Sequence, residues 1–313
     1  MRRTIVPSIA IVASVVCGWR SLVETLRIAW LNDDYTYILL ILPMSVLLCA
    51  EQRVRWWQIA KTKLHFGRAL LLSMAIASAI ASGIRVPSAA DDVQRAYSMT
   101  GVVFSWIMIF AASFGIPAAK ANLLPLLLLL GMVPPPGAVL EAIIAILQRG
   151  SAWSAHVLFS LLGVPAIQHG IQITIPGLVI NVLKECSSIR SSSFLLVSAC
   201  ALAQLFLISP WRRAGLIVLS IPLTVLKNAA RIVTIAMLGT RVNQGYLHGR
   251  IHREGGIVFF AGALSILCIA IWILRRGDPI GHETDGPVPI GTRGAGCGRT
   301  GRTAARQSRA AVL

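Results

Sequence analysis

The stretch GGIVFFAGALSILCIAIWIL, residues 255–274, contains twenty residues in a row without a charged side chain. Twenty residues of α-helix rise by about 30 Å, which matches the thickness of the hydrocarbon core of a bilayer. This stretch therefore predicts a helix that spans a membrane. Seven further apolar runs precede it, so the chain is predicted to be an all-α membrane protein with about eight transmembrane helices.

The composition agrees with this fold class. Only 13% of the residues are charged, whereas soluble domains carry about 25%. Between the fifth and sixth runs, residues 138–149 predict a short helix at the membrane interface, and residues 164–180 predict a short extended or hairpin element. The eight predicted spans lie roughly at residues 4–19, 36–50, 68–85, 99–117, 121–135, 190–208, 214–239 and 255–274.

Lys and Arg residues concentrate on one side of the predicted membrane. They precede the first span, follow the last one, and occupy the links between spans two and three, four and five, and six and seven. Loops enriched in Lys and Arg stay in the cytoplasm. The opposite, periplasmic side is therefore predicted to hold residues 20–35, 86–98, 136–189 and 240–254, and with them the extended element.

The net charge of +17 suggests a nucleic-acid partner at first sight, but its distribution argues against one. The basic residues occupy short links and the tail, and no folded basic domain is predicted. Residues 277–313 are rich in Gly, Arg, Thr and Ala, which predicts a disordered basic cytoplasmic tail after a membrane domain of residues 1–276. The six cysteines form no C-x-x-C pair, so neither a disulfide framework nor a zinc site is expected.

Cys186 stands at the predicted outer start of the sixth span, between Glu185 and Arg190. A thiol at a helix N-terminus beside a cation is biased toward the thiolate, which is the nucleophilic form. The alternative is a small, unreactive thiol packed in the core. The local pattern alone favours this alternative.

The seventh span carries Lys227, Asn228 and Arg231 within an apolar run. Arg231 lies 17 residues after Ala214, or about 26 Å along a helix, which predicts a position near the outer leaflet at the depth of Cys186. Ionisable residues at membrane depth are costly and usually functional. Arg231 could instead extend its side chain to the outer headgroups, but that alternative leaves Asn228 unexplained.

His248 and His252 precede the eighth span, again on the outer side. An imidazole exchanges protons near neutral pH, although two such residues alone would favour solvated loop histidines. Their i, i+4 spacing could also hold a metal ion, but no third protein ligand follows at a useful spacing, so no metal and no cofactor are expected.

The predicted topology brings a thiol, a guanidinium and an imidazole from three successive spans to one membrane face. A nucleophile, a cation that stabilises an oxyanion and a proton carrier are the groups that acyl transfer through a thioester requires. The topology rests on apolar runs and on Lys and Arg in the links, and none of these three residues was used to derive it.

The same residues resemble those of the exosortases, a branch of the exosortase/archaeosortase family of multi-span cysteine transpeptidases in bacterial inner membranes. The resemblance covers roughly residues 20–275. The matching segments follow the family's order: Trp30 with DDYTYILLILPMSVLL (33–48), PLLLLLGMVPPP (125–136), LQ (147–148), LLGVPAIQHG (161–170), ECSSIR (185–190), IPLTVLKNAARI (221–232) and HREGGIVF (252–259).

The resemblance implies that Cys186 is the nucleophile, that Arg231 and His252 are catalytic, and that Arg190 and Asn228 support them. It implies a multi-pass inner-membrane protein whose active site faces the periplasm. The expected substrates are exported proteins with a C-terminal sorting signal, which consists of a Pro-Glu-Pro-like motif, a membrane helix and a basic end. Membrane lipid and an extracellular polysaccharide or lipid acceptor are the other expected partners.

The sequence departs from the family pattern at three places. Ser188 stands where Gly is usual, Tyr35-Thr36-Tyr37 replaces a Ser-His pair, and Gly256-Ile257 replaces a Gly-aromatic pair. These departures indicate a divergent subfamily and bear mainly on the choice of substrate.

Two other functions stay open. One is a polysaccharide-export or transport-associated membrane protein without protease activity, in which Lys227, Asn228 and Arg231 line an anion path. The other is a non-catalytic relative that only binds sorting signals.

Overall fold

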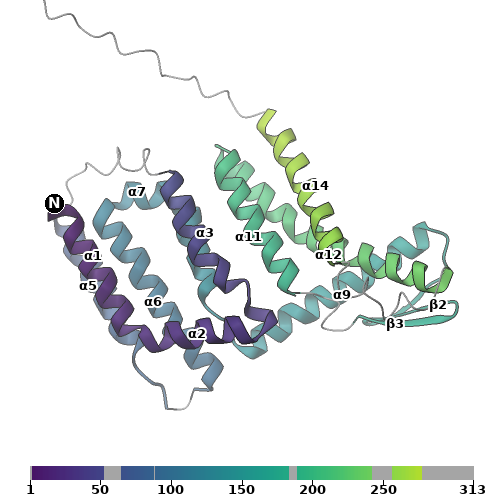
Figure 1. The fold of residues 1–313 in the computed structure, drawn as a ribbon, viewed down its shortest axis with the longest axis horizontal. Helices are drawn as coiled ribbons and strands as arrows, with labels where there is room; N and C mark the ends of the chain where they lie inside the picture. The colour runs from purple at the N-terminus through teal and green to yellow at the C-terminus, as the bar shows by residue number, and fades with distance from the viewer. Residues whose placement is uncertain (1, 53–64, 88, 183–188, 242–255, 277–313) are drawn as a thin grey trace, which may run out of the picture. The chain divides into compact units, whose positions relative to one another are not determined.

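The computed structural model describes residues 2–52, 65–87, 89–182, 189–241 and 256–276. Within these ranges the chain is mostly helical and carries one small sheet (Figure 1). The predicted tail, residues 277–313, lies outside the described residues. The division of the chain into a membrane domain and a tail at residue 276 therefore stays a prediction.

Glycine and proline separate several of the helices. Gly115 follows α6 with φ at +91°, a conformation that side chains with a Cβ rarely adopt. Three prolines, 134–136, follow η2 and directly precede α9, because proline ends one helix and is compatible with the start of the next. The helical segments are α1 (Arg2–Cys17), α2 (Trp19–Leu31), η1 (Asp33–Tyr35), α3 (Ile38–Glu51), α5 (His65–Ser82), α6 (Asp91–Phe114), α7 (Ile116–Ala121), α8 (Leu123–Leu128), η2 (Leu129–Met132), α9 (Gly137–Leu161), α11 (Ile189–Phe206), α12 (Pro210–Arg241) and α14 (Gly256–Arg276).

The predicted all-α membrane fold is confirmed, and each of the eight predicted spans overlaps at least one helix. By length and composition, the described residues contain five helices that could cross a membrane: Asp33–Glu51, α6, α11, α12 and α14. Two bent pairs raise the number to seven: Ile9–Cys17 with α2, bent by 70°, and Leu123–Met132 with α9, bent by 108°. The remaining predicted span, 68–85, corresponds to the shorter apolar helix Ala69–Ser82.

The helix predicted over residues 138–149 is longer than predicted. Helix α9 continues to Leu161 and has 25 residues. Its second half carries Ala152, Ala155 and Phe159 at helical spacing, and all three are fully buried in one core with residues of α12. This buried face extends the helix, because apolar residues three and four apart lie on the same side of it.

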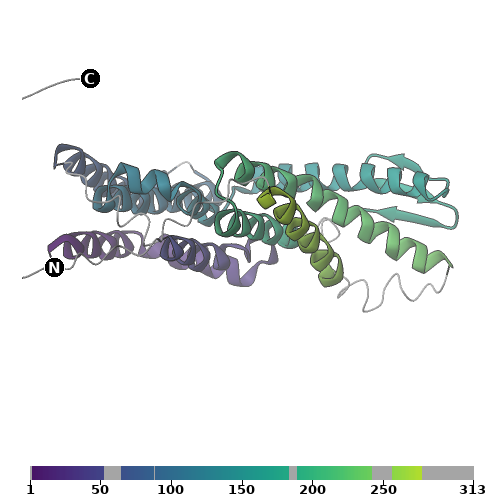
Figure 2. The same ribbon diagram turned by 90° about the horizontal axis from the view of Figure 1, so that it is seen from above.

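The extended element predicted over residues 164–180 is a three-stranded antiparallel sheet in the order β1 (Ile167–His169), β2 (Gln172–Ile175) and β3 (Leu178–Asn181). Gly170 and Gly177 supply the positive φ that the two short turns require. Figures 1 and 2 both show the sheet beside α9 and the C-terminal half of α12. Ile173 and Ile175 of β2 are buried in the core shared with these two helices.

Small residues allow the helices to approach closely. A Cβ atom added to Gly150 of α9 would lie 3.3 Å from Val225 of α12. The approach of α6 to α5 is closer still, since a Cβ on Gly101 would lie 2.8 Å from the backbone oxygen of Ser78. The hydroxyl of Ser78 donates a hydrogen bond to the carbonyl of Gly101 at 2.9 Å. Such contacts through small residues are typical of helix packing in membranes.

Replacing Gly101 by Ala should therefore force α5 and α6 apart. We expect Gly101→Ala to reduce the free energy of unfolding by about 1–3 kcal/mol, the usual cost of overpacking a core. The measurement is thermal unfolding of the purified protein in a mild detergent.

Gly262→Ala on α14 is the matched control, because a Cβ there meets nothing within 4 Å. In a helix, alanine is more favourable than glycine by up to about 1 kcal/mol, so this variant should be as stable as the parent or more so. Equal stability of the two variants would show that the α5–α6 contact is looser than described.

Candidate functional site

Three of the five predicted site residues lie within the described part of the chain: Arg190 at the start of α11, and Asn228 and Arg231 on α12. Cys186 belongs to residues 183–188 and His252 to residues 242–255, and both ranges lie outside the described residues. The site is therefore described by the helix ends and side chains that border these two ranges.

Lys227 and Asn228 connect α12 to two different neighbours. Lys227 is 7% exposed, and its Nζ donates a hydrogen bond to the hydroxyl of Ser191 on α11. Asn228 is 2% exposed, and its Nδ2 donates to the hydroxyl of Ser151 on α9 at 2.9 Å. Both contacts fix the rotation of α12, because a polar side chain buried between membrane helices needs a partner on a neighbouring helix.

Arg231 lies one helical turn beyond Lys227 on the same side of α12, a rise of about 6 Å. Since Lys227 contacts Ser191 in the first turn of α11, Arg231 also lies toward that end of α11. A Cβ atom on Gly256, the first residue of α14, would lie 4.0 Å from Nη1 of Arg231. The Arg231 guanidinium is thus next to the start of α14.

Helix α9 holds both ends of the range that contains Cys186. Gln148 Nε2 donates to the backbone oxygen of Val182, the last described residue before it, at 2.9 Å. Val182 is fully buried. On the other side of the range, Ile189 packs against Leu140 and Ile144 of α9. Val182 and Ile189, the described residues on either side of 183–188, therefore both contact α9.

Arg190 has a different position from the α12 residues. Its Nη1 donates to Oδ1 of Asp33 at 3.0 Å, and the two side chains are 52% and 84% exposed. An ion pair this exposed contributes little stability. It does join the start of α11 to η1, next to Tyr35, whose hydroxyl donates to the backbone oxygen of Pro135 at 3.2 Å.

One buried atom of the site has no hydrogen-bond partner among the described residues, namely Oδ1 of Asn228. A buried acceptor without a donor costs about 1–3 kcal/mol. Asn228 lies one turn or less from Arg231 and points to α9 through its other amide atom. Its oxygen therefore marks a place where a donor from outside the described ranges, or a substrate amide, would be stabilised.

The arrangement concentrates positive charge. Lys227 and Arg231 bring two cations to a largely apolar environment, close to the N-terminus of α11, whose dipole is also positive at that end. Such a site stabilises a thiolate or an oxyanion, because either anion gains most where water is excluded.

Three polar residues that were not predicted as site residues supply the partners of Val182, Asn228 and Lys227, namely Gln148, Ser151 and Ser191. Two signals were available: Gln148 belongs to the LQ segment (147–148) that resembles the family, and Gln148 and Ser151 are polar residues in a largely apolar helix. Identifying their partners requires the direction of α9, which depends on the bend at the three prolines.

Comparison with known proteins adds the family. A model of the transmembrane exosortase family matches residues 30–269, from the end of α2 into α14. A search of curated proteins and a search of solved structures each gave no match. The matched region includes Arg190, Asn228 and Arg231 and comprises 240 of the 313 residues. The chain therefore belongs to the transmembrane exosortase family.

Proposed function

We propose that this chain is a membrane-embedded cysteine protease and transpeptidase that cleaves the C-terminal sorting signals of exported proteins at the periplasmic face. Cys186 is the nucleophile, Arg231 the stabilising cation and His252 the proton carrier. The observation that carries this proposal is the position of the Arg231 guanidinium, next to the start of α14 and one turn past the contact between α12 and α11.

Chain connectivity keeps the other two groups near this guanidinium. Cys186 precedes Ile189 by three residues, so their Cα atoms are separated by no more than about 11 Å. His252 precedes Gly256 by four residues, which limits that separation to about 14 Å. Because Ile189 and Gly256 begin the two helices that border Arg231, a common site for the three groups is within reach.

The proposed reaction proceeds through a thioester. The Cys186 thiolate attacks the carbonyl carbon of the scissile peptide bond, and Arg231 stabilises the oxyanion that forms. The C–N bond then breaks, and the protonated His252 imidazole gives its proton to the leaving amine. The neutral imidazole next removes a proton from an acceptor, whose attack on the thioester releases Cys186 as the thiolate. The acceptor is water or a nucleophilic group of a cell-surface polysaccharide or lipid.

The two supporting residues have distinct roles in this proposal. Asn228 holds α12 against α9 through Ser151, and so fixes the position of Arg231. Arg190 joins the first turn of α11 to η1 through Asp33, at the helix end that follows Cys186. Neither residue needs to contact the reacting atoms.

In the proposed orientation, this site faces the periplasm. The basic tail, residues 277–313, lies in the cytoplasm. Arg212 at the start of α12 donates to the backbone oxygen of Leu274 near the end of α14, at 3.1 Å. Arg213 and Arg275 lie at the same end of these helices. Arginines gathered at this end, away from Arg231, support a cytoplasmic location for it.

The alternative of an anion path through the helices has less support. Lys227 and Asn228 are nearly inaccessible, and each binds a serine on a neighbouring helix. Side chains used in this way position helices, whereas a path requires accessible polar groups. A non-catalytic relative would bind the same sorting signals without cleaving them. Replacement of Cys186 distinguishes the two functions, because only cleavage requires the thiol.

Cys186→Ala should abolish processing and leave membrane insertion intact, because no thioester forms without the thiolate. The assay is co-expression with an exported protein that ends in a sorting motif, a membrane helix and an arginine cluster, followed by mass measurement of its new C-terminus. Cys17→Ala is the control, since Cys17 is an exposed thiol on α1. Normal cleavage by the Cys186→Ala protein would refute the proposal.

Arg231→Lys should slow processing by a factor of about 100 or more, the usual loss when a group that stabilises an oxyanion is displaced. Lysine keeps the charge but has neither the planar donor pair nor the length of arginine. The measurement is the rate of thioester formation with a substrate peptide in lipid nanodiscs.

Arg241→Lys at the exposed end of the same helix is the matched control and should react at the parental rate. A parental rate for Arg231→Lys as well would contradict the proposed need for the guanidinium of Arg231.

A further inference from the structure

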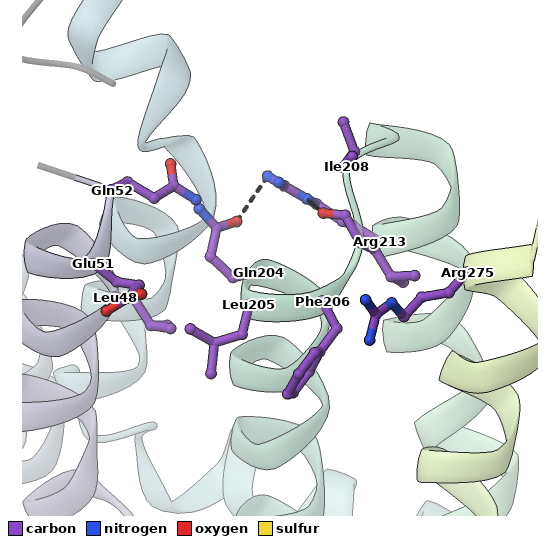
Figure 3. Close-up of a pocket in the computed structure, with 10 residues that line it drawn as sticks. Leu48, Glu51, Gln52, Gln204, Leu205, Phe206, Ile208, Arg213 and Arg275 are labelled. Atoms are coloured by element: carbon purple, nitrogen blue, oxygen red, sulfur yellow. Dashed lines mark hydrogen bonds between the residues drawn. The ribbon is translucent and has the colours of Figure 1, made fainter. Parts of the chain in front are cut away.

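A cavity of about 570 Å³ lies at the far end of α11 from the candidate site. The 18 residues of α11 separate the two places, a distance of about 27 Å along the helix axis. The ends of α3, α11 and α14 and the start of α12 border this cavity (Figure 3). The lining residues that matter here are Leu48, Glu51, Gln204, Phe206, Arg213 and Arg275.

Two polar side chains in the cavity are held in place by each other. Arg213 donates from Nη1 to Oε1 of Gln204 at 2.8 Å and from Nε to the backbone oxygen of Leu207 at 2.7 Å. Gln204 is only 4% exposed, and its Nε2 has no acceptor within the part of the chain that the structure describes. A buried amide donor next to an arginine favours a ligand rich in oxygen acceptors.

Arg275 connects this cavity to a second one. Its guanidinium carbon lies 5.7 Å from the centroid of the Phe206 ring, in the range of a cation–π contact. Arg275 and Phe206 also line a cavity of about 410 Å³ between α11 and α14, together with Leu202, Cys268, Ile271 and Arg276. This second cavity is largely apolar and continues from Arg275 back to Cys268, seven residues or about 10 Å along α14.

We propose that the two cavities form one binding site for an anionic phospholipid. The phosphate lies at Arg213, Gln204 and Arg275, and an acyl chain lies in the groove between α11 and α14. The phosphate supplies an acceptor for Nε2 of Gln204, and guanidinium groups bind phosphate with directed, charge-assisted hydrogen bonds. The groove matches an acyl chain, because its walls are side chains of membrane helices.

The charge of the lining selects the occupant. Among the described lining residues, Arg213, Arg275 and Arg276 oppose the one carboxylate of Glu51, which gives these residues a net charge of +2. A basic peptide, such as the arginine-rich end of a sorting signal, would meet like charge there. An anionic headgroup meets opposite charge, and anionic lipids are concentrated in the cytoplasmic leaflet that basic ends of membrane helices face.

A lipid bound at this site would hold three helices together. One lipid contacts α11 through Gln204, α12 through Arg213 and α14 through Arg275. These helices also carry the candidate site at their other ends, but the proposal does not depend on any cleavage reaction. The direct consequence of the proposal is that an anionic phospholipid stabilises the folded protein.

Thermal unfolding of the full-length protein in a mild detergent tests the proposal. Phosphatidylglycerol should raise the midpoint by several degrees in a saturable way, because a ligand that binds only the folded state stabilises it. Equal concentrations of phosphatidylcholine or inorganic phosphate should have less than a third of that effect. An equal shift with phosphatidylcholine would show that binding does not require an anionic headgroup. An equal shift with inorganic phosphate would show that the site binds a soluble anion. Either result would overturn the proposal.

The double variant Arg213→Gln/Arg275→Gln should bind phosphatidylglycerol at least ten times more weakly, and Arg241→Gln, at the opposite end of α12, should bind it like the parent. Unchanged binding by the double variant would overturn the proposal.

A second measurement needs no variant. Cys268 in the groove and Cys17 on α1 are both exposed thiols. Phosphatidylglycerol should slow alkylation of Cys268 at least fivefold, as followed by mass spectrometry of the peptides, and leave Cys17 unaffected. Equal alkylation rates with and without this lipid would refute the assignment of the groove, and so would protection of Cys268 by an arginine-rich peptide but not by the lipid.

Discussion

A polar side chain between membrane helices has no water to bind, and this constraint determines the arrangement around α12. Lys227 and Asn228 lie in adjacent positions and bind serines on two different helices, α11 and α9. Two contacts in different directions fix both the rotation and the depth of α12. The position of Arg231, one turn further along, follows from them. The packing of α12 against α9 and α11 therefore sets the position of the Arg231 guanidinium.

Helix α9 is the common support for these contacts. It provides Ser151 to Asn228, Gln148 to the carbonyl of Val182, and an apolar surface to Ile189. Its direction is set by the 108° bend at the three prolines that precede it. The sheet adds a second support, since Ile173 and Ile175 are buried between α9 and α12. The residues proposed for chemistry come from the last part of the chain, and the middle part positions them.

The sequence was sufficient for those features that depend on local composition. Apolar runs predicted the helices, and residues 164–180 predicted a short extended or hairpin element where the sheet lies. The sequence was insufficient for features that depend on how distant segments pack against one another. The full length of α9 depends on burial of Ala152 and Phe159 against α12, and the pairs Gln148–Val182 and Lys227–Ser191 depend on how distant segments cross. Polar residues in apolar helices indicated that hydrogen-bond partners exist on neighbouring segments. They did not indicate which residues these partners are.

The two ends of α11 show how one helix serves opposite requirements. At its start, the ammonium group of Lys227 is buried and Arg231 lies one turn further along α12, an arrangement that would stabilise an anion. At its end, Arg213 and Arg275 line an open cavity between helices, which suits lasting contact with an anion that the membrane itself supplies. Arg231 and Arg213 are both partly buried, so the neighbours of each side chain, and not its exposure, distinguish the two ends. The Arg231 guanidinium lies next to the start of α14, whereas Arg213 and Arg275 lie beside a buried amide and an aromatic ring at the other ends of these helices.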